Sequence, residues 1–273
     1  MADLIERLLR ATVRLETENS VGTGFFYQYK RTEEMFAPVI VSNRHMFENH
    51  NQLKIEFWAK NNSEKLEKIL LPICNLQQSV IYHPNPEIDL AILPIAGIHN
   101  LFIESKYEPQ FIYLGSEILP SKADLDDMSA LEDVIVIGYP NGLYDKENLR
   151  PLIRKGITAS DIKVDYENQP IFIIDCEIVP GSSGSPVFIY NPVGRFSSNS
   201  GISIGNTYLK FVGINSAVFT QNIQGEITQT PTSLISNTPS YIGLGIILKS
   251  SLLDDFDDLL GKAERERENE TQS

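Results

Sequence analysis

The amino-acid sequence predicts an all-β protein with a short helix near each end. Short apolar or alternating runs recur along most of the chain and are separated by turn-forming residues, which is typical of strands joined by turns. The runs fall into two sets of about six, and a set of that size suits one antiparallel barrel. We therefore predict two six-stranded antiparallel β-barrels, at residues 12–110 and 131–249, joined by a connector at 111–130.

The first predicted element is a helix at residues 1–11. Leu4, Ile5, Leu8 and Leu9 recur with helical spacing and therefore share one face. We expect this face to pack onto the first barrel. A helix that binds a partner protein is the alternative.

Six runs supply the strands of the first barrel. In Leu53–Phe57, apolar and charged residues alternate with a period of two. Two other runs carry residues of chemical interest, because one apolar strand leads directly into His45 and another opens at Asp89. The predicted strands are 12–16, 24–29, 39–47, 53–57, 69–73 and 89–93.

Six further runs supply the strands of the second barrel, after a connector that is polar and marked by prolines. Two long polar segments, 195–206 and 220–240, interrupt this barrel and are predicted to be loops, which at this length are usually functional or disordered. The predicted strands are 133–138, 152–160, 171–179, 187–190, 208–217 and 242–248.

The last predicted element is a helix at 250–261, followed by a charged and polar tail at 262–273 that we expect to be disordered. Ser251 lies near the expected N-cap, Asp254 lies in the first turn, where an acid suits the helix dipole, and Gly261 can end the helix.

Composition excludes one class of function. The chain has 273 residues, a length that suits one compact protein or two small lobes sharing a core. Its net charge is −13, and an acidic surface repels phosphate, so a nucleic-acid partner is not expected.

The two cysteines, Cys74 and Cys176, are far apart in the sequence, so the chain does not look built for an oxidising compartment, where disulfides form and persist. The N-terminus is acidic where a signal peptide would be basic and then apolar, and no stretch is long and apolar enough for a membrane helix. We therefore expect a cytoplasmic protein without a membrane partner.

The most informative stretch is the turn Pro180–Pro186, which reads Pro-Gly-Ser-Ser-Gly-Ser-Pro between two hydrophobic runs. A tight turn of this kind presents the Ser183 hydroxyl on a sharply bent backbone. It also lets the backbone N–H groups of Gly181 and Ser183 point into one space, where they can hold an oxyanion. A Gly/Ser hairpin without chemistry is the alternative reading of this segment alone.

Two other segments favour the chemical reading. A serine hydroxyl needs a base near neutral pH, and that base needs an acid to orient it. His45 follows the apolar run at 39–44, and Asp89 opens the apolar run at 89–93. The sequence therefore contains a candidate base, acid and nucleophile in the order His, Asp, Ser.

Five ordered motifs resemble those of the trypsin/chymotrypsin-like serine proteases, over nearly the whole chain, with the bacterial HtrA-like branch as the closest pattern. They are Gly22–Phe26, Ser42–His45, Asp89–Leu93, Ile137–Pro140 and Gly181–Pro186. The resemblance implies a chymotrypsin-like fold in which two barrels face each other across the active cleft. HtrA proteins commonly carry a PDZ domain after the protease, for which this sequence leaves no room.

The resemblance also implies roles for individual residues. Ser183 would be the nucleophile, His45 the general base and Asp89 the group that orients the histidine. The backbone N–H groups of Gly181 and Ser183 would form the oxyanion hole. Ser216 matches the family serine that hydrogen-bonds the catalytic aspartate, with an ordinary strand serine as the alternative.

The substrate pocket is less well determined. In secreted trypsins the residue six before the serine selects basic P1 side chains, and here it is Glu177. In the HtrA-like branch the next residue lines the pocket, here Ile178, opposite Ala217 and Val218. Because neighbouring strand residues face opposite ways, only one of Glu177 and Ile178 can face the pocket. We expect a small aliphatic P1 residue, since a desolvated Glu177 would be costly without a cation.

These observations predict a serine endopeptidase that acts on protein or peptide substrates through an acyl-enzyme. A catalytically inactive scaffold that binds a partner, and a serine esterase, are the alternatives. No cofactor and no metal are expected, because no cluster of His and Cys has the spacing of metal ligands. A protease without a visible zymogen segment should need narrow specificity or a regulatory protein partner.

Overall fold

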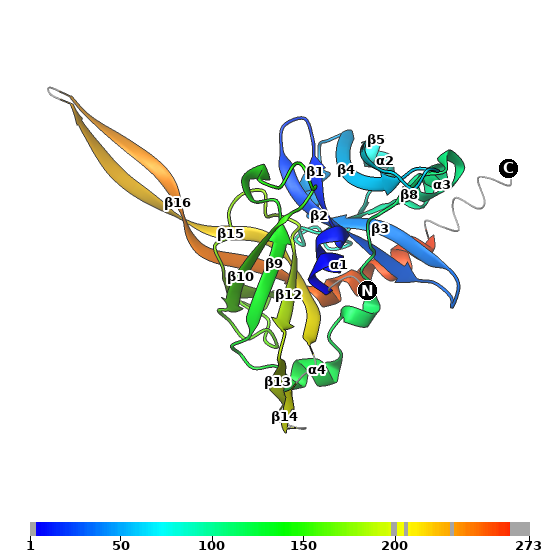
Figure 1. Cartoon of the computed structure of the whole chain (residues 1–273). Coiled ribbons are helices and arrows are strands. Elements are labelled where there is room, and N and C mark those ends of the chain that lie inside the picture. Colours follow the sequence, from blue (N-terminus) through cyan, green and yellow to red (C-terminus); the bar gives the residue numbers. More distant parts are fainter. Residues whose placement is uncertain (1–3, 198–200, 205–206, 230–231, 263–273) are drawn as a thin grey trace.

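A computed structural model of the chain describes residues 4–197, 201–204, 207–229 and 232–262 (Figure 1). It consists mostly of antiparallel strands in two units, with few and short helices. The predicted chymotrypsin-like, all-β fold class is therefore confirmed, although only the second unit is a closed six-stranded barrel and the first is a sheet of eight strands. Within the described ranges, no helix is long and apolar enough to cross a membrane.

The first unit is a sheet of eight strands in the order β5-β4-β1-β2-β3-β7-β6, with β8 paired to β4. Apolar residues alternate along β4, and every second residue from Leu53 to Ala59 is buried. The strands are β1 (Thr12–Glu16), β2 (Val21–Lys30), β3 (Phe36–Ser42), β4 (Gln52–Lys60), β5 (Leu66–Cys74), β6 (Ile81–Tyr82), β7 (Ala91–Pro94) and β8 (Glu108–Pro109). A short helix, α2 (Leu76–Ser79), follows β5.

After β7 and before the second unit, the chain forms short helices that the sequence analysis did not predict. They are α3 (Ala96–Ser105), the 3-10 turn η2 (Ser116–Ile118) and α4 (Lys122–Asp127). Helix α4 begins at a capping box, in which the Ser121 side chain accepts from the Asp124 N–H and the Asp124 carboxylate accepts from the Ser121 N–H.

The second unit is a closed barrel of six strands in the order β10-β11-β16-β15-β12-β9. All six overlap the runs predicted from the sequence. The strands are β9 (Asp133–Gly138), β10 (Leu152–Thr158), β11 (Ile171–Asp175), β12 (Pro186–Asn191), β15 (Tyr208–Gln229) and β16 (Thr232–Lys249).

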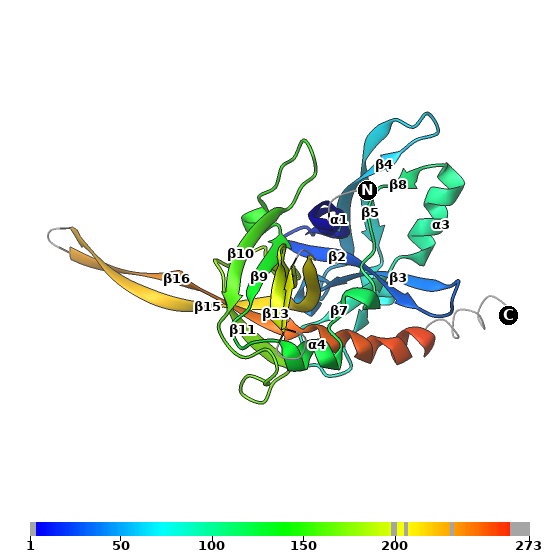
Figure 2. The ribbon, with the colours of Figure 1, turned by 60° about the horizontal axis from the view of Figure 1, so that its bottom comes forward.

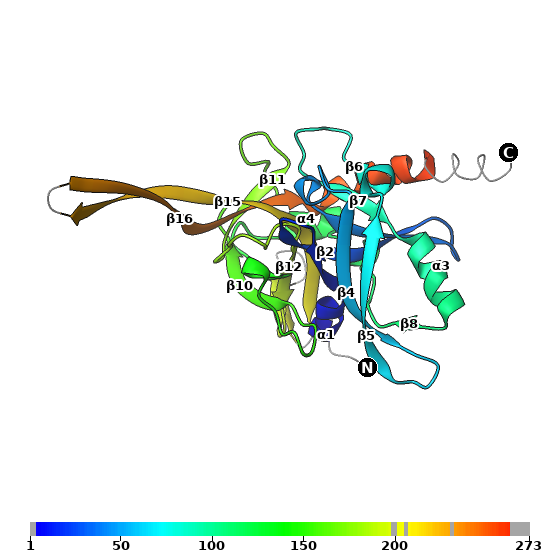
Figure 3. The same cartoon turned by 90° about the horizontal axis from the view of Figure 1, so that it is seen from above.

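Both polar segments predicted as loops are instead strands. Strands β13 (Gly194–Ser197) and β14 (Gly201–Ile204) form a small hairpin. Strands β15 and β16 continue beyond the barrel in antiparallel register as far as the pair Gln229 and Thr232. They project from the body as a two-stranded arm in all three views (Figures 1, 2 and 3). The segment is polar, but its Thr and Ile residues favour strands, and pairing begun in the barrel extends outward.

The two units share one hydrophobic core. It contains Leu8 of helix α1 (Leu4–Ala11), Phe25 of the first unit and Phe211 of the second, and the Phe25 and Phe211 rings lie 5.2 Å apart. Ile5 and Leu9 of α1 pack against the same core, as the sequence predicted. The two units are therefore packed into one body around buried aromatic rings.

The C-terminal helical segment also joins this core. It begins as the 3-10 turn η4 (Ser250–Phe256) and continues as a helix over 257–262, pointing away from the arm (Figure 2). Phe256 is buried in the shared core, and the Tyr29 hydroxyl donates to the Leu253 carbonyl at 3.0 Å. Ser251 lies inside the turn and not at its N-cap, which is Lys249. The predicted tail at 263–273 lies outside the described residues.

Candidate active site

His45 lies directly after the end of β3. The strand stops at Ser42, earlier than predicted, and His45 is in the 3-10 turn η1 (Arg44–Met46). Asn43 is fully buried and donates from its side-chain nitrogen to the backbone carbonyl of Asp89 at 2.8 Å. This bond ties the histidine turn to the segment that carries the aspartate, while the His45 side chain itself stays half exposed.

The Asp89 carboxylate accepts three hydrogen bonds. Its Oδ1 accepts from the backbone N–H of His45 at 3.1 Å. Its Oδ2 lies 2.8 Å from Nδ1 of His45 and accepts from the Ser216 hydroxyl at 3.0 Å. An ionised carboxylate only accepts, so the His45 proton belongs on Nδ1 and Nε2 carries the free lone pair. Asp89 therefore fixes both the orientation and the tautomer of the ring.

Ser183 lies on the turn between β11 and β12, and two glycines make this turn possible. Gly181 and Gly184 have φ angles of +85° and +83°, in the region that side chains disfavour. A Cβ on Gly181 would lie 2.6 Å from the Tyr139 carbonyl oxygen, and one on Gly184 would collide with the Thr23 carbonyl oxygen. The glycines predicted for conformational reasons are thus also required by close packing.

The Ser183 hydroxyl lies 3.5 Å from the backbone carbonyl of Ser216, to which it donates. Among the described residues, it makes no hydrogen bond to the His45 ring. Ser216 therefore links the site, because its hydroxyl contacts Asp89 and its carbonyl contacts Ser183. The structure brings together His45, Asp89, Ser216 and Ser183 through this chain of contacts.

The two predicted oxyanion donors have free N–H groups. In the turn, the N–H groups of Ser182, Gly184 and Ser185 donate to backbone carbonyls at 2.8–3.1 Å. Those of Gly181 and Ser183 donate to no acceptor in the part of the chain that the structure describes. Gly181 and Ser183 are partly exposed, so their unused N–H groups are available to an anionic oxygen.

Two residues, Asn215 of the second barrel and Thr23 of the first unit, hold this turn and were not singled out from the sequence. The Asn215 side chain donates to the Ser182 carbonyl at 3.0 Å, and the Asn215 backbone pairs with Gly184 and Ser185. Thr23 contacts the turn from the first unit. Thr23 lies inside the motif Gly22–Phe26 and Asn215 directly precedes Ser216, but nothing in the sequence indicates their contacts.

The residues predicted to line the substrate pocket differ in how far they are exposed to solvent. Ile178 is buried in the core of the second barrel. The Glu177 side chain points outward, is 89% exposed and pairs with Arg154 at 3.5 Å. Ala217 is exposed next to Ser216, whereas the side chain of Val218 lies outside the described part of the structure.

Two other titratable residues, Cys176 and His83, are buried and belong to the packing of the protein. Burial raises the pKa of the Cys176 thiol to about 11, which disfavours the thiolate and makes a nucleophilic role unsuitable. His83 is buried and lies 2.9 Å from Asp255 of η4, so it joins the first unit to the C-terminal segment.

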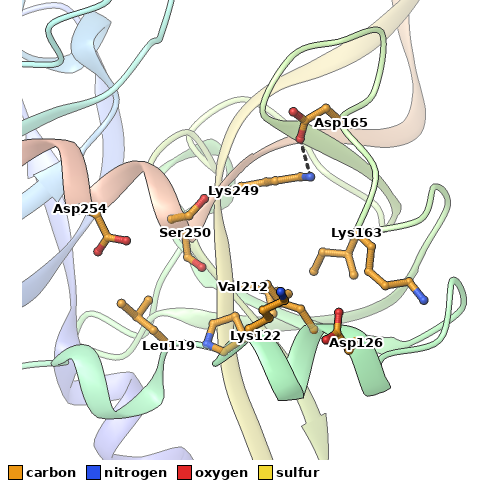
Figure 4. A pocket seen from close by; sticks show the side chains of 13 residues that line it. Leu119, Lys122, Asp126, Lys163, Asp165, Val212, Lys249, Ser250 and Asp254 are labelled. Carbon is orange, nitrogen blue, oxygen red and sulfur yellow. Dashed lines mark hydrogen bonds and ion pairs between the residues drawn. The ribbon is translucent and has the colours of Figure 1, made fainter.

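A cavity of about 360 Å³ lies apart from these residues, between α4, the 162–165 loop and η4 (Figure 4). Its walls combine apolar side chains with charged ones, and Lys249 forms an ion pair with Asp165 at 2.6 Å across one side. Neither His45, Asp89 nor Ser183 lines it. The main lining residues are Leu119, Lys122, Leu125, Ile162, Lys163, Val212 and Asp254.

Comparison with known protein families matches the chain to one family model. The family model described as a trypsin-like peptidase domain matches residues 22–194. No curated protein sequence is significantly similar to the chain.

Solved structures with a similar arrangement have low sequence identity. A Glu endopeptidase is 12% identical, with 92% of this chain and 90% of that chain covered and a TM-score of 0.42. An inactive form of the Rv3671c protein from M. tuberculosis H37Rv is 12% identical, with 90% and 84% covered and a TM-score of 0.43. A scabies mite inactivated protease paralogue is 10% identical, with 95% and 96% covered and a TM-score of 0.44.

Proposed function

Because the chain belongs to the family of trypsin-like peptidase domains, we propose that it is a serine endopeptidase with Ser183 as nucleophile. One observation carries the proposal. Asp89 Oδ2 contacts both His45 Nδ1 and the Ser216 hydroxyl, and the carbonyl of the same Ser216 contacts the Ser183 hydroxyl. A base, the acid that orients it and a nucleophile thus share one small network.

In the proposed reaction, the Ser183 hydroxyl leaves its long bond to the Ser216 carbonyl and donates to Nε2 of His45. Catalytic hydrogen bonds are often long before substrate binds. Ser183 Oγ forms a bond to the scissile carbonyl carbon as His45 takes its proton, and His45 then protonates the leaving amine as the C–N bond breaks. In the second half, water attacks the acyl carbon as His45 takes its proton, and His45 then protonates Ser183 Oγ as the bond between Oγ and the acyl carbon breaks. Asp89 stabilises the imidazolium that forms in each half.

The free N–H groups of Gly181 and Ser183 would stabilise the tetrahedral oxyanion. Removing one such donor typically costs about a hundred- to a thousand-fold in rate. Because both donors belong to the backbone, no side-chain substitution removes them directly. The glycine turn that aims them is therefore the part on which the rate depends.

For the P1 residue, an uncharged and small aliphatic side chain is favoured. Glu177 is exposed and already pairs with Arg154, so a basic P1 side chain would have to compete with that arginine. Paired peptide substrates with Val or Arg at P1 test this choice. A strong preference for Arg would overturn it.

We also propose a cytoplasmic location, supported by the two free cysteines Cys74 and Cys176. Thiol trapping of the protein in intact cells, followed by mass measurement, would detect the two reduced thiols. Recovery of the protein from an oxidising compartment would contradict the location.

The function is tested by labelling with a fluorophosphonate probe. We expect wild-type protein to be labelled, and Ser183→Ala and His45→Ala to lose labelling. Ser251→Ala, which changes an exposed serine of η4, serves as the matched control and should label like wild type.

A second assay follows peptide-bond cleavage in a protein substrate and separates the remaining outcomes. A labelled wild-type protein that cleaves peptide bonds supports the proposal. Labelling with ester hydrolysis but without peptide cleavage would indicate an esterase. Wild-type protein that is not labelled would indicate a binding scaffold.

A further inference from the structure

Thr23 of β2 belongs to the first unit but contacts the nucleophile turn of the second. It is fully buried, and its neighbours are Gly22 and Gly24. Its backbone N–H donates to the Ser183 carbonyl at 2.9 Å. Its hydroxyl donates to the Gly181 carbonyl, also at 2.9 Å. One residue of the first unit therefore holds both ends of the segment from Gly181 to Ser183.

The Thr23 hydroxyl has a second partner. It accepts a hydrogen bond from the backbone N–H of Tyr139 at 3.0 Å, at the start of the 3-10 turn η3 (Pro140–Gly142). The Thr23 carbonyl accepts from the Ser42 hydroxyl at 2.7 Å. All polar groups of this buried threonine are thus satisfied, and its hydroxyl bridges two loops of the other unit.

The peptide bond on the other side of Gly181 is fixed as well. The Pro180 carbonyl accepts from the Asn141 N–H of η3 at 2.6 Å. In a trans peptide the C=O and N–H groups point in opposite directions. The Gly181 N–H therefore points away from Asn141, and it is left free for an anionic oxygen.

We propose that Thr23 is a positioning residue for the oxyanion donor Gly181, an inference that rests on the proposed peptidase function. Glycine has wide backbone freedom, so the aim of its N–H depends on what holds the flanking peptides. The Thr23 hydroxyl holds the peptide after Gly181 directly. Through Tyr139 it holds η3, whose Asn141 fixes the peptide before Gly181.

The test compares Thr23→Val, which keeps the shape but removes the hydroxyl, with Thr23→Ser, which keeps the hydroxyl. We expect Thr23→Val to lower kcat about ten- to a hundred-fold, part of the effect of losing an oxyanion donor, with KM changed by no more than about twofold. Thr23→Ser should recover kcat to within about threefold of wild type. Ser42→Ala removes a buried hydrogen bond to the same threonine without touching Gly181, and it controls for lost stability.

A peptide boronate distinguishes misorientation of the Gly181 N–H from a general loss of structure, because its tetrahedral adduct places an oxygen where the oxyanion forms. Its affinity should fall in Thr23→Val in proportion to kcat/KM, whereas affinity for a product peptide stays within about twofold. Equal losses of kcat in Thr23→Val and Ser42→Ala, or wild-type activity in Thr23→Val, would overturn the positioning role alone. Wild-type protein that neither labels nor cleaves peptides would overturn the proposed function and this inference together.

Discussion

The hydroxyl of Ser216 donates a 3.0 Å hydrogen bond to the carboxylate of Asp89, and these residues belong to different β units. The same carboxylate oxygen, Oδ2, lies 2.8 Å from Nδ1 of His45. One oxygen therefore joins β15 of the second barrel to the histidine turn of the first unit. The orientation of the imidazole depends on how the two units pack.

Ser216→Ala removes the second donor to Asp89 Oδ2. Hydrogen bonds to charged groups are worth about 1.5–3 kcal/mol, and only part of that acts on the transition state. We expect kcat/KM for a peptide substrate to fall about tenfold. Thr207→Ala, which removes an exposed hydroxyl just before β15, is the control. A Ser216→Ala protein as active as wild type would show that His45 alone is enough to hold Asp89.

Arg154→Ala removes the cation that pairs with Glu177. With Glu177 free, basic P1 side chains should be accepted better, and we expect the Arg-to-Val ratio of kcat/KM to rise about 1.5- to fivefold, since exposed ion pairs are worth about 0.2–1 kcal/mol. The two-substrate assay measures this ratio. Lys155→Ala, whose exposed side chain pairs with Asp133, provides a matched loss of charge on the same strand. An unchanged ratio would place Glu177 outside the P1 pocket.

Gly184→Ala should destabilise the protein strongly. Its φ is +83°, and a Cβ there would collide with the Thr23 carbonyl and the Ser42 hydroxyl. We expect a loss of about 2–4 kcal/mol in the free energy of unfolding, measured with urea. Gly97→Ala in α3 is the control, because nothing lies within 4 Å of its Cβ position and alanine favours helix. A tolerated Gly184→Ala would mean that the turn can rearrange.

Asp124→Asn should lower stability in a pH-dependent way. Desolvation raises the pKa of Asp124, but hydrogen bonds from Lys210 and Ser121 outweigh it and lower the pKa to about 2. A pKa that is lower in the folded state stabilises the protein above the ordinary value of 3.8, and this stability is lost as pH falls through about 2. Wild type should therefore exceed Asp124→Asn in Tm at pH 7, and the difference should shrink between about pH 4 and pH 2.

The control for this comparison is Asp126→Asn, which changes an exposed carboxylate in the same helix. Its Tm should stay close to that of wild type at each pH. A difference between wild type and Asp124→Asn that stays constant down to pH 2 would contradict the role given to the ion pair between Asp124 and Lys210, which is 2.8 Å long.

The two thiols should react differently with a disulfide reagent. Cys74 is exposed, whereas Cys176 is buried with its pKa raised to about 11. We expect one thiol per chain to react in the native protein at pH 8 and both to react in denaturant. Cys74→Ser should leave no fast-reacting thiol. Two fast thiols in native wild-type protein would show that the core around Cys176 opens readily.

The sequence predicted strands well where a local run of apolar residues forms a buried strand. Strands β9, β11 and β12 of the second barrel are mainly apolar runs, and β9 has the bounds 133–138 in both the prediction and the structure. The arm of β15 and β16 was read as a loop because its residues are polar. Helix α3 was missed because its Phe102 becomes buried only against the first unit.

The candidate site also combines features that local sequence predicts with features that it does not. Ser183, His45 and Asp89 stand in local motifs, and the structure links them through Ser216. The contacts of Thr23 with Gly181 and Tyr139 join residues that are 158 and 116 positions apart. No periodicity or spacing reports such pairings, since they arise only when the two units pack.

The length of chain between these contacting residues determines when the candidate site can assemble. Thr23 meets Gly181 across 158 positions, and Tyr29 meets Leu253 across 224. Contacts that close such long stretches of chain form slowly, because much loop entropy is lost before they are made. During synthesis, a ribosome must release the chain through Leu253 before the shared core can close. Under the proposed function, a chain made only as far as Asp89 carries the base and the acid but lacks Ser183, and it is therefore expected to be inactive.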